Sequence, residues 1–408
     1  MSQLLLLKRT TLLASALGFA WGTASAQAVL KLTRVPATTP ARDSLFVAGS
    51  FNGWNPRSPR YALQKQPDGT YQISLPPNLG RIEYKFTRGS WPTVEIDAQN
   101  QQIANRTADL TAAREIASQV LAWDDQSGAA SAPSKHTATP QVRLLSAAFA
   151  MPQLGRQRRV WLYLPADYAA NPARRYPVLY LHDGQNVFDA ATSYGGEWGV
   201  DETLDRLRQA GQDATGSIVV AVDNGDQYRS DEYIPWPSAA LRGQSHHGGQ
   251  GGAYVDFLAL TLKPYVDAHY RTRPDVAHTG IAGSSLGGLI SVYAALKYPK
   301  VFGKVGAFSP AFWVCNDSLR AFAKTHPAAR TARFYFMCGP KESETMLPLM
   351  AQWRDELRAE GVPAANLSFH APADGEHREW FWRREFPAAY RFLFQPVPAS
   401  AAVGARAK

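Results

Sequence analysis

The sequence predicts an α/β protein with a doubly wound, mostly parallel sheet, preceded by a small all-β sandwich. Beyond Pro140, apolar runs such as "SIVVAVDNG" alternate with amphipathic segments of helical period. Strands that are apolar on both faces indicate a parallel sheet covered by helices on both sides. Before Trp123 the apolar runs are short, alternate with polar residues and are broken by Gly, Pro, Asn and Asp, which is typical of a β-sandwich.

The N-terminal residues have the pattern of a secretory signal. Lys8 and Arg9 precede an apolar stretch, and Ala24-Ser25-Ala26 suits cleavage before Gln27. The alternative is a membrane anchor, but the apolar stretch is shorter than the ~20 residues that a spanning helix needs. We therefore expect an exported protein, periplasmic or secreted, with no membrane partner in its mature form. The predicted segments are a signal peptide (1–26), a sandwich (27–123), a linker rich in Ser, Ala and Pro (124–140), an α/β domain (141–395) and a disordered tail (396–408).

The elements follow in order from the same patterns. In the first domain, "SLFVAGSFNGWNP", "GTYQISLPP" and "RIEYKFTRGSWPTVEID" each predict a strand and a turn. In the second domain the predicted strands are "RRVWLYLPADY", "YPVLYLHDG", "SIVVAVDNG", "HTGIAGSS", "VFGKVGAFSPAFW", "ARFYFMCGP" and "NLSFHAP". The predicted helices between and after them are "VDETLDRLRQAG", "AYVDFLALTLKPYVDAHY", "LGGLISVYAALKYP", "MAQWRDELRAEG" and "EWFWRREFPAAYRFLF".

Charge and cysteine content exclude some functions. The net charge of +9 is spread along the 408 residues rather than gathered in a basic block, so nucleic-acid binding is not expected. The two cysteines, Cys315 and Cys338, have no metal-ligand neighbours, and no zinc site is expected. In an exported protein they form either a disulfide or two buried thiols.

A candidate nucleophile lies in "TGIAGSSLGGLISVYAALKYP". A G-x-S-x-G turn between a strand and a helix exposes its serine, and the flanking glycines leave room for the sharp turn. Centring on Ser285 places Gly283 and Gly287 in the required positions, whereas centring on Ser284 does not. The motif predicts Ser285 as the nucleophile.

A serine needs a base, and the base needs an acid to orient it. Three histidines follow the nucleophile, and His377 lies in a polar loop after the last strand, where the base belongs. His326 lies in a connection that looks exposed, and His370 lies inside a strand pattern. The candidates for the acid are Glu342, Glu344 and Asp374, and sequence spacing alone does not decide among them.

The oxyanion of a tetrahedral intermediate needs two hydrogen-bond donors. The first is the backbone N–H of Leu286, at the N-terminus of the helix that follows the nucleophile. The second is expected from Gly184 or Gln185 in "LYLHDGQNVFD".

The segment "EYIPW" and the loop after it are candidates for the substrate pocket. Glu232, Tyr233 and Trp236 are the expected lining residues, and the Gly-rich loop 237–254 is expected to be a mobile cover. His246 and His247 are adjacent, tend to point apart and have no carboxylate nearby in sequence, so no metal site is predicted.

Several motifs together resemble the bacterial putative-esterase family of α/β-hydrolases. They are "VLYLHDGQNVFD", "GGEWGVDETLDRL", "SDEYIPW", "LKPYVDAHYRTRPD", "AGSSLGGLISVYAALKYPKVFGK" and "FSPAFW", within residues 142–395. This group includes enterobactin-type siderophore esterases and the feruloyl and acetyl esterases of carbohydrate esterase family one. The resemblance implies an acid in a G-x-x-D/E loop and a base in a G-x-H loop, which favours Glu342 with His377, and it implies no cofactor.

The first domain resembles the starch- and glycogen-binding carbohydrate modules. The resemblance rests on "LFVAGSFNGWNP", "IEYKFTRGSW" and "ANRT". It implies sugar contacts by Trp54, Lys85 and Trp91, with Asn105 as a fourth residue. Aromatic rings suit the apolar C–H face of a sugar, but the same tryptophans could instead belong to the sandwich core.

These observations together predict an exported serine esterase that acts through an acyl-enzyme. A front module of the glycan-binding type favours carbohydrate-linked esters of the acetyl or feruloyl kind, with a small-molecule or glycan ester as substrate and possible α-glucan binding. The alternative within the family is a siderophore trilactone esterase. The alternative from another class is a glycan-binding protein with an inert hydrolase domain.

Overall fold

The computed structural model describes residues 27–395 except 53, 78, 100–102, 104, 112–114, 127–134, 194–195, 242–245 and 341. The expected signal peptide and C-terminal tail lie outside the described residues. Within the described part of the chain, no helix combines the length and the apolar character needed to cross a membrane.

The larger domain is built on one eight-stranded sheet of order β10-β11-β13-β12-β14-β15-β16-β17. The first three strands pair antiparallel, and all later pairs from β13 to β17 are parallel. The strands are β10 (Val142–Met151), β11 (Arg156–Tyr163), β12 (Val178–Leu181), β13 (Ile218–Val222), β14 (Thr279–Ser284), β15 (Lys304–Phe308), β16 (Arg333–Met337) and β17 (Leu367–His370).

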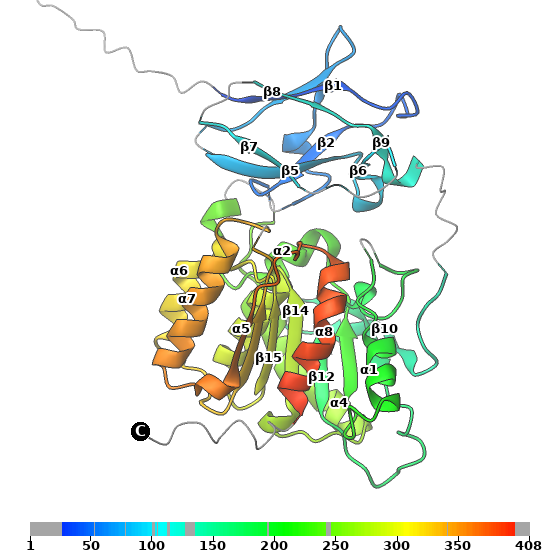
Figure 1. Cartoon of the computed structure of the whole chain (residues 1–408), viewed down its shortest axis with the longest axis vertical. Helices are drawn as coiled ribbons and strands as arrows, with labels where there is room; N and C mark the ends of the chain where they lie inside the picture. The colour runs from blue at the N-terminus through cyan, green and yellow to red at the C-terminus, as the bar shows by residue number, and fades with distance from the viewer. Residues whose placement is uncertain are drawn as a thin grey trace, which may run out of the picture.

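Helices cover both faces of this sheet (Figure 1). One face packs against α3, α5 and α7, and the other packs against α1 and α8, because successive strand residues point to opposite faces and both sets are apolar. The helices are α1 (Val200–Gln209), α2 (Arg229–Tyr233), α3 (Gly251–Phe257), α4 (Lys263–His269), α5 (Leu286–Lys297), α6 (Asn316–Ala323), α7 (Met346–Ala359) and α8 (Glu379–Phe394). A π-helical segment, Leu258–Leu262, joins α3 to α4 where the sequence predicts one continuous helix.

The smaller domain packs several short sheets around an apolar core that includes Leu30, Tyr84 and Trp123. Its sheets have the orders β3-β4-β1-β8, β2-β5-β7 and β6-β9. The strands are β1 (Val29–Arg34), β2 (Phe46–Gly49), β3 (Gln64–Lys65), β4 (Tyr71–Ser74), β5 (Arg81–Thr87), β6 (Glu95–Ile96), β7 (Arg106–Asp109), β8 (Glu115–Gln119) and β9 (Ala122–Trp123). The predicted fold class, an α/β-hydrolase sheet behind an all-β module, is confirmed.

The two domains lie one above the other, with the module over the end of the sheet at which α8 begins (Figure 1). The described part of the linker, residues 135–140, is fastened to the larger domain. The His136 ring hydrogen-bonds the Asp189 carboxylate at 2.7 Å, and the Thr139 N–H donates to Asp201 Oδ2 at 2.7 Å. The predicted linker therefore contacts the larger domain through His136 and Thr139.

Candidate active site

The candidate catalytic loops all leave the same edge of the sheet. Ser284, Phe308, Met337 and His370 lie side by side at the ends of β14, β15, β16 and β17. Because these strands are parallel, the loops that follow them emerge together. The parallel register therefore gathers residues from four separate stretches of sequence.

Ser285 occupies the sharp turn between β14 and α5. Its backbone has φ 57° and ψ −120°, a strained conformation that a non-glycine residue rarely adopts. Its N–H donates to the Phe308 carbonyl at 2.9 Å, and its own carbonyl accepts from the Ala311 N–H at 3.0 Å. A Cβ atom at Gly283 would lie 2.9 Å from the His182 ring and 3.0 Å from the Gly287 backbone, so the turn leaves no room there for a side chain.

The structure brings His377 and Glu342 together. His377 Nδ1 lies 2.8 Å from Glu342 Oε2, and the Glu342 side chain is fully buried. This contact leaves Nε2 as the ring nitrogen available to a serine hydroxyl. The loops that carry the pair touch through their glycines, because a Cβ atom at Gly339 would lie 2.0 Å from the Gly375 carbonyl oxygen.

Further hydrogen bonds hold the Glu342 carboxylate in place. Ser309 Oγ donates to Glu342 Oε1 at 2.8 Å and accepts from Trp382 Nε1 at 2.9 Å, and the Gly339 N–H donates to the same carboxylate oxygen. Ser309 has φ 44° at the end of β15, which places its hydroxyl against the acid. Sequence reasoning missed this role, although "FSPAFW" was among the family motifs.

The other candidates for acid and base lie elsewhere. Glu344 pairs with Arg81 of the module, and Asp374 pairs with Arg384 on α8. His370 hydrogen-bonds Ser368 at 2.8 Å through Nε2 and stacks on Tyr335, whereas His326 stacks on Phe322. None of these four side chains takes part in the pair formed by Glu342 and His377.

The expected oxyanion donors flank the nucleophile. β12 lies beside β14, so the turn Gly184–Asn186 after β12 is next to the Ser285 turn. Within the described residues, the N–H groups of Gly184, Gln185 and Leu286 have no protein acceptor. A Cβ atom at Gly184 would lie 2.8 Å from the Asp223 backbone nitrogen, so only glycine fits there.

Buried polar groups hold the oxyanion turn in place. Asp183, at φ 55°, accepts from Arg229 Nε at 2.7 Å and Nη2 at 2.9 Å, and from Asn224 at 2.7 Å. Burial alone would raise the pKa of the Asp183 carboxyl, but Arg229 and Asn224 hold it below its ordinary value. Beside it, burial lowers the pKa of His182 to about 3, so this imidazole stays neutral.

The residues expected to line the pocket are paired with or packed against other side chains of the same domain. The Glu232 carboxylate is fully buried between Arg156 and Arg158, at 2.8 and 2.6 Å. Tyr233 is also fully buried, and its hydroxyl accepts from the Asp183 N–H at 3.2 Å. Trp236 packs on other aromatic rings, Tyr293 and Phe322. For Glu232 and Tyr233 these placements correct the prediction of a pocket lining, because both side chains are fully buried. Trp236 is half-buried and stays a predicted lining residue. The pattern in the sequence does not distinguish lining from support.

The described end of loop 237–254 is fastened rather than loose. His246 Nδ1 lies 2.6 Å from Asp231, and the Gly248 N–H donates to the same carboxylate at 3.1 Å. Asp231 therefore gives His246 the neighbouring carboxylate that the sequence did not indicate. The mobile cover stays a prediction, and residues 242–245 lie outside the described part. Asp231 approaches from α2, so local spacing gave no sign of it.

Alternate residues of β5 face the catalytic loops. Arg81 pairs with Glu344, two residues after the acid, and Glu83 lies within electrostatic reach of His377 and Glu342. Lys85 lies near Arg378 and Glu379, and Arg378 Nη2 donates to the Ile103 carbonyl of the module. Side chains two apart on a strand share a face, so one face of the module borders the active site.

The residues predicted to contact sugar do not form one exposed surface. The Trp54 and Trp91 rings are 6.4 Å apart, tilted and half-buried, outside the sandwich core. Lys85 is buried, with 7% of its surface exposed, and burial together with Arg378 lowers its pKa to about 8. Asn105 Nδ2 donates to Glu83 Oε2 at 3.1 Å. The Lys85 side chain is therefore not in open solvent, and it lies within electrostatic reach of Arg378 in the larger domain.

The two cysteines are free and buried. Burial raises the pKa of both thiols to about 12, which keeps them protonated and unreactive. Of the two states that the sequence left open, the structure has the buried thiols.

The fold and these loops define an α/β-hydrolase. A family model named Esterase, described as "Putative esterase", matches residues 151–393, which is more than half of the chain. The chain belongs to this esterase family and is a carboxylic ester hydrolase.

Individual relatives are consistent with this assignment. A siderophore enterobactin esterase of Emericella nidulans is 27% identical over 179 residues, covering 38% of this chain and 55% of that protein. An α-amylase of Niallia circulans is 39% identical over 107 residues in the N-terminal region, covering 26% of this chain and 8% of that protein. The crystal structure of the Shigella flexneri enterobactin esterase FES with enterobactin matches with a TM-score of 0.50 at 16% identity. The match covers 86% of this chain and 88% of that one. It shows that the two chains share a fold.

Proposed function

We propose that the protein is a serine esterase that forms an acyl-enzyme on Ser285. The contact between His377 and Glu342 carries this proposal, because an imidazole held through Nδ1 by a buried carboxylate presents Nε2 as a base. His377 takes the proton of Ser285 as its Oγ attacks the ester carbonyl. It then gives that proton to the leaving alcohol as the carbon–oxygen bond breaks.

Deacylation reuses the same groups. Water loses a proton to His377 and attacks the acyl carbon, and the released Ser285 oxygen takes the proton back. The N–H groups of Leu286 and of Gly184 or Gln185 stabilise the oxyanion in both steps, and removal of one such donor typically costs a factor of ~100–1000 in turnover.

We further propose that the substrate is an ester of a carbohydrate, of the acetyl or feruloyl kind. The support is the starch-binding type of the module together with Glu83, which lies within electrostatic reach of His377, and Asn105, which donates to Glu83. A carboxylate and an amide suit the hydroxyl groups of a sugar held between the two domains. In this arrangement the module binds the substrate of the neighbouring site rather than a separate glucan.

A siderophore trilactone is the second candidate substrate. The relative from Emericella nidulans is named for such an activity, and its similarity covers part of the hydrolase domain. The N-terminal signal pattern favours the carbohydrate ester, since we propose that the protein is exported.

The proposal is tested with the purified mature protein and a panel of p-nitrophenyl acetate, acetylated and feruloylated sugars, and an enterobactin-type trilactone. We expect Ser285→Ala to abolish hydrolysis, and its matched neighbour Ser284→Ala to keep most of it. Turnover retained by Ser285→Ala would contradict the mechanism. Preference for the trilactone over every sugar ester would overturn the substrate assignment while leaving the mechanism intact.

A further inference from the structure

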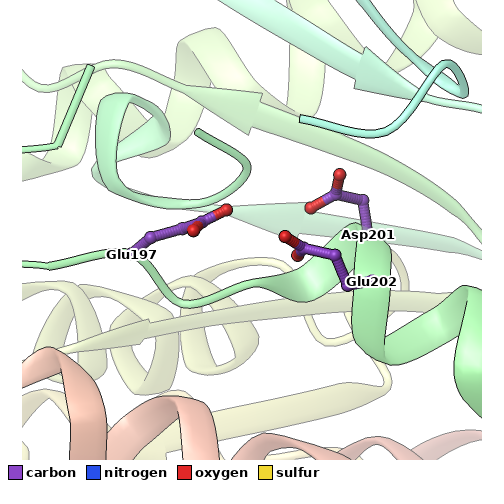
Figure 2. Close-up of side chains that lie close together, drawn as sticks. All are labelled: Glu197, Asp201 and Glu202. Carbon is purple, nitrogen blue, oxygen red and sulfur yellow. The ribbon is translucent and has the colours of Figure 1, made fainter. Parts of the chain in front are cut away.

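Three carboxylates converge where α1 begins (Figure 2). Glu197 comes from the segment before the helix, whereas Asp201 and Glu202 belong to its first turn. One oxygen atom from each lies within 4.8 Å of the other two. The group lies outside the catalytic machinery described above.

These oxygens point into the protein and lack partners. Asp201 is fully buried and Glu197 is 6% exposed. Within the described part of the chain, Glu197 Oε1, Asp201 Oδ1 and Glu202 Oε2 are buried and accept no hydrogen bond, and neither does the Thr139 hydroxyl have a partner. The Thr139 N–H donates to the other oxygen of Asp201, so that hydroxyl belongs to the same group. Buried polar atoms are nearly always paired, and four unpaired oxygens at one place indicate a missing ligand.

Within the described residues, the ion pairs give these three carboxylates one cation, Arg383 at Glu197. Arg383 approaches Glu197 only to 3.4 Å, and Asp189 close by is already bonded to His136 and the Thr137 N–H. The dipole of α1 favours acidic residues in its first turn, which accounts for Asp201 and Glu202 individually. It does not account for Glu197, which lies outside the helix, or for the unpartnered oxygens.

We propose that Glu197, Asp201 and Glu202, with the Thr139 hydroxyl, form a calcium-binding site. An all-oxygen set suits a hard cation. With Ca–O distances of ~2.3–2.6 Å, two ligands of one calcium ion are at most ~5 Å apart, a limit that the three carboxylate oxygens meet. Water molecules complete the coordination.

Without an ion, the carboxylates of Glu197, Asp201 and Glu202 repel one another. Glu197, Asp201 and Glu202 place one carboxylate oxygen each within 4.8 Å of the other two, and the Asp201 side chain is fully buried. A divalent ion at this place offsets the repulsion between the carboxylates.

The ion would join two parts of the chain that matter for the esterase. Through Thr139 it holds the linker from the module. Through the Glu197 segment it reaches the oxyanion turn, since the Trp198 N–H donates to the Asn186 carbonyl at 2.9 Å. Calcium is therefore expected to stabilise the docked linker and the loop that carries Gly184 and Gln185.

Terbium luminescence tests the site on the mature full-length protein after treatment with EGTA. Trp198, next to Glu197 and buried, is placed to sensitise a bound Tb³⁺ ion. We expect one Tb³⁺ per chain, displacement by Ca²⁺ and a higher melting temperature with Ca²⁺. Glu202→Gln, which keeps the side-chain shape, should weaken Ca²⁺ binding at least tenfold. Asp317→Asn, in the exposed first turn of α6, should leave it unchanged.

The wild-type titration alone is decisive. Absence of stoichiometric Tb³⁺ uptake, or of any Ca²⁺-dependent rise in melting temperature, would overturn the calcium site. So would equal Ca²⁺ affinity in the wild type and both Glu202→Gln and Glu197→Gln, or stabilisation by Mg²⁺ but not by Ca²⁺.

Discussion

At the scale of residues, the proposed catalytic pair of His377 and Glu342 depends on contacts that local sequence only partly reveals. The glycines around Ser285 follow from the geometry of a strand–turn–helix, so a single stretch of sequence is enough to propose the nucleophile. Glu342 and Glu344 have almost the same local surroundings and could not be separated by spacing. They differ because Glu344 meets Arg81, 263 residues away, whereas Glu342 meets His377 and Ser309.

Ser309 is expected to act on catalysis through its hydrogen bond to Glu342. We expect Ser309→Ala to lower kcat by about tenfold to a hundredfold with little change in KM, because a hydrogen bond to a charged group contributes ~1.5–3 kcal/mol. Ser217→Ala is the matched control, since Ser217 is also buried and hydrogen-bonded, to Tyr390, at the other end of the sheet. Steady-state kinetics on p-nitrophenyl acetate measures both; equal rates in wild type and Ser309→Ala would remove the role of Ser309.

At the scale of elements, periodicity predicted the strands β11 to β17 of the large sheet, because most of them are largely apolar runs between helices, but it did not predict the edge strand β10. It predicted less about β5, whose alternation shows which residues share a face but not what covers that face. Lys85 alternates with Arg81 and Glu83 like any solvent-facing residue. Lys85 is nevertheless buried, and its electrostatic neighbours include Arg378 and Glu379 of the other domain.

The burial of Lys85 makes a prediction about stability and pH. Its pKa is lowered from 10.5 to about 8, so between these pH values the unfolded chain holds the proton and the folded chain does not. The free energy of unfolding therefore rises with pH through this window, and below pH 8 burial of the charge opposes folding. Lys85→Met should be more stable than wild type at pH 7, by roughly 1–3 kcal/mol, with the gain vanishing near pH 10.5.

Urea denaturation at pH 7 and pH 10 checks this prediction. The comparison with wild type is needed because the pKa of Lys304 is also lowered to about 8 and contributes equally to both proteins. Lys65→Met, at an exposed site on β3, is the control and should show no pH-dependent gain. A loss of stability in Lys85→Met at pH 7 would contradict the account of this lysine.

At the scale of the whole molecule, two domains of familiar type meet at the loops of Glu342 and His377. The sequence indicated each domain separately, yet nothing in it placed the outer face of β5 against the loops of Glu342 and His377. That arrangement depends on contacts between distant segments, such as Arg378 with the Ile103 carbonyl. The face expected to bind glucan in solvent thereby borders the catalytic loops.

If the module binds part of the substrate, its variants should discriminate by substrate size. We expect Glu83→Ala with Asn105→Ala to raise KM for a feruloylated or acetylated oligosaccharide by about tenfold, and to leave hydrolysis of p-nitrophenyl acetate unchanged. That factor corresponds to the loss of one or two hydrogen bonds. Glu115→Ala, on the exposed strand β8 of the other sheet, is the control. Equal changes for both substrates would indicate a structural role instead.

The central claim is that Ser285 is the nucleophile activated by His377, and active-site labelling tests it most directly. The mature protein is treated with a fluorophosphonate, and the modified peptide is mapped by mass spectrometry. We predict one label per chain on Ser285, lost in Ser285→Ala, slowed in His377→Gln and retained in Ser284→Ala. Labelling of another serine, or no labelling of a folded and hydrolytically active protein, would contradict the account.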